Sequence, residues 1–137
     1  MTVHSLHLTQ NPLPVTLLYG GLCALLVTLL GARVSQQRIQ RKISVKAEVP
    51  AEILREVRAH GNAAEWVPMM IVLLAILELS GVRSMALHLL GGSMFIGRLV
   101  HAYGMIAKNR NASIPGAAIT YLVSAVMSIW AIWLHFA

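Results

Sequence analysis

Long runs of apolar residues alternate with short polar segments along the chain, and this alternation predicts its elements. The runs cover residues 13–32, 57–80, 85–107 and 114–136. Each comes close to the ~20 residues that a helix needs to cross the hydrocarbon core of a bilayer. Lipid offers the backbone no water to bond, so each run is expected to be helical. The pattern predicts an all-α membrane protein, a four-helix transmembrane bundle in a single domain over residues 1–137.

The composition agrees with a membrane protein and argues against a soluble one. Hydrophobic residues make up 57% of the chain and charged residues 12%, whereas soluble domains average about 45–50% and about 25%. Cys23 is the single cysteine, so neither an intramolecular disulfide nor a structural metal site is expected. The formal net charge of +6 gathers between the apolar runs and does not cover a soluble face. We therefore expect no nucleic-acid partner.

Basic residues predict which ends of the helices face the cytoplasm. The segments between the first and second runs and between the third and fourth hold most of them, namely Arg33, Arg38, Arg41, Lys42, Lys46, Lys108 and Arg110. The connection between the second and third runs holds only Arg83. Short connections rich in lysine and arginine stay on the cytoplasmic side of a membrane. The pattern predicts cytoplasmic loops at 33–50 and 108–113, with both chain termini outside.

The second apolar run opens with the polar stretch "REVRAHGNAAEWVP", residues 55–68. Within it Arg55, Arg58, Asn62 and Glu65 follow one another at steps of three and four residues. Residues at this spacing share one face of a helix. The stretch is therefore a polar stripe along one side of the second helix.

The third run carries a matching stripe of Arg98, His101, Met105 and Lys108. Glu65 and Arg98 each lie about nine residues from the inner end of their helix, or ~13 Å at 1.5 Å per residue. The two helices run antiparallel, so these side chains can meet directly or through a ligand. An arginine exposed to lipid costs about 3 kcal/mol on insertion scales, so Arg98 is expected to face the interior of the bundle.

The two stripes allow two interpretations. Arg98 and Glu65 can form a structural ion pair that fixes the register of the two helices. Alternatively, the stripes line a pocket, in which the positive charges outnumber the single carboxylate and open toward the cytoplasm. We favour the pocket, and because arginine binds carboxylates through two parallel hydrogen bonds, we expect an anionic, water-soluble ligand. For His60, ligand contact and a capping or solvated position at the interface both stay open.

Other polar and small residues are expected to serve the structure. Glu78 and Arg83 lie near the outer end of the second helix and are predicted to pair at the interface. Pro68 is predicted to bend this helix, since it lacks a backbone donor. Gly97 and Gly116 are expected to let neighbouring helices approach closely.

Two motifs carry a resemblance to a known family. "RxxRAHGNxxEWVP" at 55–68 and "GRLVHAYG" at 97–104 resemble the MAPEG family, the membrane-associated proteins of eicosanoid and glutathione metabolism. The likeness extends over nearly the whole chain and is strongest to the small bacterial branch. It implies a homotrimer of four-helix bundles in a bacterial inner membrane, with glutathione bound between adjacent protomers near the cytoplasmic face.

The resemblance also implies the residues of the site. Carried over by position, glutathione contacts fall on Arg38, Arg58, Asn62, Glu65, Trp66, Arg98 and His101. Many eukaryotic members have a tyrosine where this chain has Met105, and their thiol-activating arginine falls at Ala112. Arg110 lies two residues away and is the candidate for thiol activation.

The function implied is that of a microsomal-type glutathione transferase with peroxidase activity, acting in detoxification. A positive pocket favours the thiolate, which is the nucleophile, and a lipophilic electrophile or lipid hydroperoxide would reach it from the membrane lipids. A ligand-binding or structural membrane protein of the same fold, without catalysis, is the alternative. A small multidrug transporter also has four spans, but such proteins carry a carboxylate in the first span, and 13–32 has none.

Overall fold

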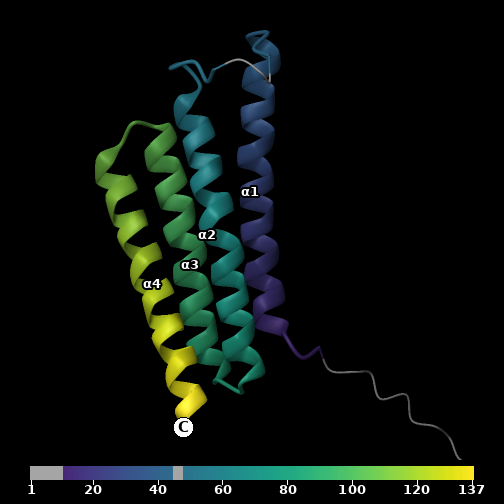
Figure 1. Cartoon of the computed structure of the whole chain (residues 1–137), viewed down its shortest axis with the longest axis vertical. Coiled ribbons are helices and arrows are strands. Elements are labelled where there is room, and N and C mark those ends of the chain that lie inside the picture. The colour runs from purple at the N-terminus through teal and green to yellow at the C-terminus, as the bar shows by residue number, and fades with distance from the viewer. Residues whose placement is uncertain (1–10, 45–47) are drawn as a thin grey trace, which may run out of the picture.

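The computed structural model describes residues 11–44 and 48–137 and consists of antiparallel helices that lie side by side (Figure 1). In the described residues the helices are α1 Pro14–Gln40, α2 Leu54–Leu79, α3 Ser84–Ile106 and α4 Arg110–Phe136. All four are long and apolar enough to cross a membrane. The predicted all-α architecture is therefore confirmed, with four candidate membrane spans in the described residues.

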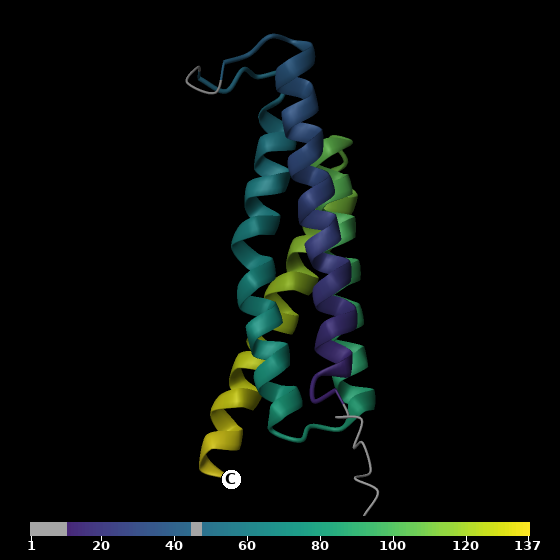
Figure 2. The same ribbon diagram turned by 90° about the vertical axis from the view of Figure 1, so that its right-hand side faces the viewer.

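The helices form a three-helix unit to which the fourth is added. α1, α2 and α3 pack against one another, whereas α4 packs against α2 and α3 and, among the described residues, does not contact α1. In the view of Figure 2, α4 crosses the bundle obliquely. Large side chains fill the main core, among them Met70, Leu74, Leu77, Leu87, Met94 and Met127. A smaller core of Leu30, Ala59, Ala63 and Ala102 lies toward the other end of the bundle.

The basic segments gather at one end of the molecule. The α1–α2 and α3–α4 connections lie together there, while the C-terminus, the start of α1 and the α2–α3 connection lie at the opposite end (Figure 1). We call the end with the α1–α2 and α3–α4 connections the basic end. Residues 45–47, which include Lys46, and residues 1–10 lie outside the described part of the chain.

The first connection is shorter than predicted because α1 continues to Gln40. Residues 33–40 were expected in a loop, but they include glutamine and arginine, which favour helices, and no glycine or proline. A helix satisfies its own backbone, so it can project beyond the apolar run into water. The chain turns at Lys42, whose φ of 54° is left-handed.

The α3–α4 connection is also shorter than predicted, because α4 begins at Arg110 and not at residue 114. Asn109 caps this helix, and its side chain accepts a hydrogen bond from Ala112 N at 3.3 Å. Asparagine is a favoured cap because its side-chain oxygen satisfies an unpaired N–H of the first turn. Of the predicted 108–113 loop, residues 110–113 are therefore helical.

Glycines set a very close approach between α3 and α4. A Cβ added at Gly104 would overlap the backbone of Ser113, and one added at Gly116 would overlap the backbone of His101. At Gly97 it would come within 2.7 Å of Ile119 Cγ2. The predicted packing role of Gly97 and Gly116 is confirmed, and the two helix backbones lie close together beside His101.

Glu78 holds the start of α1 and does not pair with Arg83, so the predicted interfacial pair is wrong for the described residues. Its carboxylate oxygens accept hydrogen bonds from Val15 N at 2.8 Å and Thr16 N at 2.7 Å. The first N–H groups of a helix have no partner within it, and Leu13 supplies no side-chain cap. The carboxylate satisfies these groups and lies at the positive end of the helix dipole.

Candidate functional site

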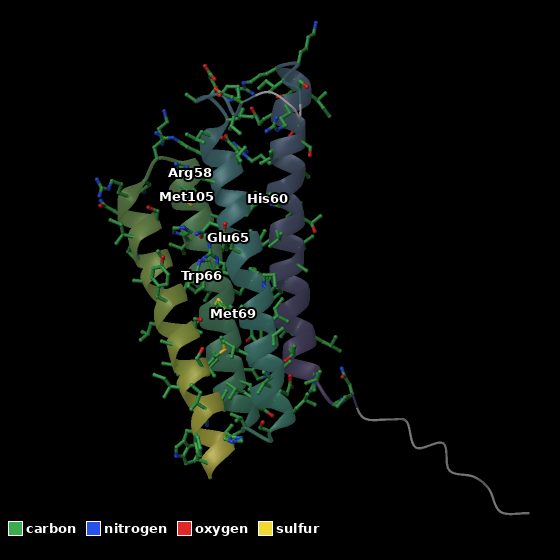
Figure 3. All side chains as sticks on the ribbon, viewed as in Figure 1. Arg58, His60, Glu65, Trp66, Met69 and Met105 are labelled. Atoms are coloured by element: carbon green, nitrogen blue, oxygen red, sulfur yellow. The ribbon has the colours of Figure 1, made fainter. Side chains whose placement is uncertain are left out.

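A polar groove runs along α2 near the basic end. Its volume is about 450 Å³, and it is lined by Val57, Arg58, Gly61, Asn62, Glu65 and Met105. Figure 3 shows Arg58, Met105 and Glu65 one below another from the basic end, with Trp66 and Met69 further down. Three residues of the predicted α2 stripe, Arg58, Asn62 and Glu65, and Met105 of the α3 stripe therefore line a single groove, whereas Arg55 does not line it.

The charged groups of the polar groove are exposed. Arg58 and Glu65 both lie on the surface of the single chain. Within the described residues, no ion pair joins Glu65 to Arg58 or to Arg98. The predicted direct pair between Glu65 and Arg98 is therefore not formed, and the charges of the groove face outward, where a ligand can reach them.

Arg98 is fully buried, with 1% of its surface exposed. Its Nη2 donates to Asn62 Oδ1 at 2.6 Å and its Nη1 to Thr120 Oγ1 at 3.3 Å. The Thr120 hydroxyl in turn donates to Gly116 O at 2.9 Å. The Arg98 Nε–H is buried without a partner in the described chain. Arg98 thus faces the interior as predicted, but its described partners are neutral and leave its charge uncompensated.

A small cavity lies beside Arg98, where α2, α3 and α4 meet. We call it the Arg98 cavity; it measures about 70 Å³ and is lined by Asn62, Trp66, Arg98, His101, Ala117, Thr120 and Tyr121. Asn62 also lines the polar groove, so the two spaces adjoin. Trp66 packs edge-on against Tyr121, with ring centroids 5.0 Å apart, and the pair forms one wall.

His101 is held by the start of α4. Its Nδ1 lies 2.7 Å from the carbonyl oxygen of Ser113. A carbonyl only accepts hydrogen bonds, so Nδ1 carries the hydrogen. In the neutral ring Nε2 is then an acceptor with a free lone pair.

Three predicted residues lie away from both spaces. Arg38 donates to Ser44 O at 3.1 Å at the end of α1, and Arg110 is exposed in the first turn of α4. Neither lines the polar groove or the Arg98 cavity. His60 lies on the α1 side of α2 (Figure 3), where Gly31 makes room for its ring. The single chain therefore does not bring Arg38 or Arg110 to the site.

The contribution of α4 was not expected from the sequence. Thr120, Tyr121 and Ala117 line the Arg98 cavity, but the uncharged fourth run suggested no polar role for this helix. Thr120 is a buried polar residue within an apolar helix, 1% exposed. The Thr120 hydroxyl was the available signal in the sequence for a polar role of α4, because a buried hydroxyl needs a hydrogen-bond partner.

An apolar groove lies on the other side of α2. It measures about 560 Å³ and runs between α1 and α2, lined by Ala24, Val27, Thr28, Ala64, Val67, Pro68 and Ile71. Ala64 lines the apolar groove and the next residue, Glu65, lines the polar one. The two grooves therefore lie on different faces of α2.

These features define a class: α-helical membrane proteins with a buried arginine and a polar groove within the membrane-spanning region. Residues 16–133 match the model of the MAPEG family, and the chain belongs to that family. The inner membrane protein YecN of Escherichia coli strain K12 is 29% identical over 119 residues, which cover 87% of this chain and 91% of that protein. YecN of Escherichia coli O6:H1 strain CFT073 is similar to the same extent.

Proposed function

We propose that this protein is a microsomal-type glutathione transferase that binds glutathione in the polar groove and presents its thiolate to lipophilic electrophiles or lipid hydroperoxides. The observation that carries the proposal is Arg98, a buried guanidinium without a carboxylate partner in the described chain, beside a groove that opens near the basic end. A buried charge is costly until an opposite charge compensates it, so this site favours an anionic ligand. Membership of the MAPEG family supports glutathione as that ligand.

The charges of the polar groove complement those of glutathione. The peptide carries two carboxylates and one ammonium group, and Arg58 suits a carboxylate while Glu65 suits the ammonium. Because the Asn62 side-chain oxygen accepts a hydrogen bond from Arg98, its NH₂ group remains to donate to a carbonyl of the ligand. The groove thus offers each polar part of glutathione a matching partner.

A homotrimer would complete this site. Glu65 lies ~16 Å from the start of α2 at 1.5 Å per residue and is exposed in the single chain. A charged side chain facing lipid costs about 3 kcal/mol, so we infer that a second copy covers this face of α2. The same assembly would let Arg38 of a neighbouring copy reach the groove.

The second substrate would arrive from the bilayer. Large apolar side chains cover the outer surfaces of all four helices, and the apolar groove between α1 and α2 can hold a lipophilic compound. We place the basic end in the cytoplasm and the protein in a bacterial inner membrane, with both termini outside, since basic connections stay on the cytoplasmic side. The name of the relative YecN, an inner membrane protein, supports this location.

One observation favours binding without catalysis. Met105 lines the polar groove, and its thioether can donate no hydrogen bond to a thiolate. Turnover with a chlorinated nitroaromatic compound separates the alternatives: a transferase releases chloride, whereas a binding protein takes up glutathione without product.

Calorimetric titration of the detergent-purified protein with glutathione tests the proposal. The wild-type protein is expected to bind, and Arg58→Met is expected to weaken binding by about 10-fold or more, since hydrogen bonds to charged groups contribute about 1.5–3 kcal/mol. Arg83→Met is the matched control, because Arg83 is also exposed but lies in the α2–α3 connection, at the opposite end. Absence of glutathione binding to the wild type would contradict the proposal.

A further inference from the structure

The Arg98 cavity has the size of a thiol group and not of a peptide. A cavity needs about 10–15 Å³ to hold one water molecule, so the cavity of about 70 Å³ has room for a few small groups and not for a tripeptide. These can be the CH₂ and SH groups of a cysteine side chain. The adjoining polar groove of about 450 Å³ has the space for the rest of a short peptide.

His101 lines this cavity and carries a proton acceptor. The Ser113 carbonyl fixes Nδ1 as the donor at 2.7 Å, which leaves Nε2 as the basic nitrogen of the neutral ring. Gly116 lets α4 approach the backbone of His101, and Gly104 lets α3 approach the backbone of Ser113. The ring is thus held at the lining of the cavity by a backbone group and not by a mobile side chain.

Arg98 supplies the charge that a thiolate needs. It is the cationic group at the cavity, and its described partners, Asn62 and Thr120, are neutral. The other titratable groups near Arg98 are Tyr121 of α4, which lines the cavity, and the buried Cys23 of α1, while Arg58 and Glu65 of α2 lie in the adjoining groove. A thiolate in the cavity would compensate the buried guanidinium, and the guanidinium would stabilise the thiolate.

We infer that the Arg98 cavity is the thiol site of this protein and that His101 is its catalytic base. This assignment rests on the proposed function, and it replaces Arg110 as the group that activates the thiol. The glutathione S–H bond breaks, the proton moves to His101 Nε2, and the electron pair stays on sulfur beside Arg98. With a chlorinated aromatic substrate, sulfur forms a bond to the ring carbon, chloride leaves with the bonding pair, and His101 releases the proton to water.

The test uses the ultraviolet absorbance of the thiolate when glutathione is added to the full-length protein. His101→Asn is the informative variant, because the asparagine amide can still donate to the Ser113 carbonyl but offers no basic nitrogen. Glutathione is still expected to bind this variant, because Arg58, Asn62 and Glu65 of the polar groove are unchanged. Turnover is expected to fall about 100-fold or more, and thiolate to appear at a higher pH than in the wild type, because Arg98 alone then stabilises it.

His135→Asn is the matched control, since His135 is exposed in the last turn of α4, at the opposite end. His101→Gln is a second variant if His101→Asn does not fold, and thermal unfolding establishes that each variant is folded. Bound glutathione with wild-type turnover, and with thiolate absorbance that follows the same pH dependence as in the wild type, in a folded His101 variant would overturn the inference and leave the proposed function standing. No glutathione binding to the wild type would overturn both.

Discussion

The buried guanidinium of Arg98 depends on Asn62, which accepts its hydrogen bond at 2.6 Å. Asn62→Leu removes that acceptor, and leaving a buried charged donor unsatisfied is expected to lower the free energy of unfolding by about 2–3 kcal/mol. Asn62→Asp instead places a carboxylate beside the guanidinium and compensates its charge. Thermal unfolding in detergent should therefore rank Asn62→Asp well above Asn62→Leu. Equal destabilisation by the two variants would show that Arg98 does not engage this side chain.

Glu78 stabilises the junction between α1 and α2 by accepting hydrogen bonds from two N–H groups of the first turn of α1. Glu78→Ala is expected to lower the free energy of unfolding by about 0.5–2 kcal/mol, as for loss of a helix cap. Glu52→Ala is the control, because Glu52 is exposed in the turn before α2. Thermal unfolding of the two variants measures the difference. A Glu78 variant as stable as the Glu52 variant would contradict the capping role.

At the scale of residues, the sequence predicted the polar side chains with which α2 lines the polar groove, but it did not predict the Arg98 cavity. Arg58, Asn62 and Glu65 share a face because their spacing matches a helical turn, which requires no knowledge of the neighbouring helices. Thr120 and Tyr121 reach the cavity only through the packing of α4 against α2 and α3. That packing depends on contacts between distant parts of the chain, and hydrophobic periodicity does not reveal it.

At the scale of helices, the approach of α3 to α4 depends on glycine. Gly116→Ala would drive a methyl group into the backbone of His101, and forcing extra volume into a packed contact costs about 1–3 kcal/mol. Gly21→Ala is the control, since a Cβ at Gly21 meets nothing within 4 Å. Thermal unfolding should show a loss of stability for Gly116→Ala alone. If both alanine variants keep wild-type stability, the close contact of these helices is not as described.

The number and type of helices could be predicted, whereas two of their ends could not. Apolar runs of membrane-spanning length identify helices through composition alone. Helix ends follow local chemistry, such as the Asn109 cap that starts α4 early and the polar residues 33–40 that prolong α1. The capping of α1 by Glu78 could not be predicted either, because its hydrogen-bond partners at the start of α1 are distant in sequence.

At the scale of the whole molecule, the exposed charges of α2 favour the proposed assembly of several copies. Native mass spectrometry of the protein released from detergent is expected to give three copies of the chain, since a single copy would leave Arg58 and Glu65 of α2 facing lipid. Replacing Met69, half-exposed on α2 one helical turn beyond Glu65, with tryptophan is expected to weaken this assembly. A wild-type protein that remains a single chain in mild detergent would contradict the trimer.

The most direct test of the account is an experimental density map of the purified protein with glutathione. Density for the tripeptide is expected in the polar groove, with a carboxylate against Arg58 and the sulfur in the Arg98 cavity within hydrogen-bonding distance of His101 Nε2. A groove that stays empty at saturating glutathione, or that holds only a lipid chain, would contradict the central claim that this groove is a glutathione site.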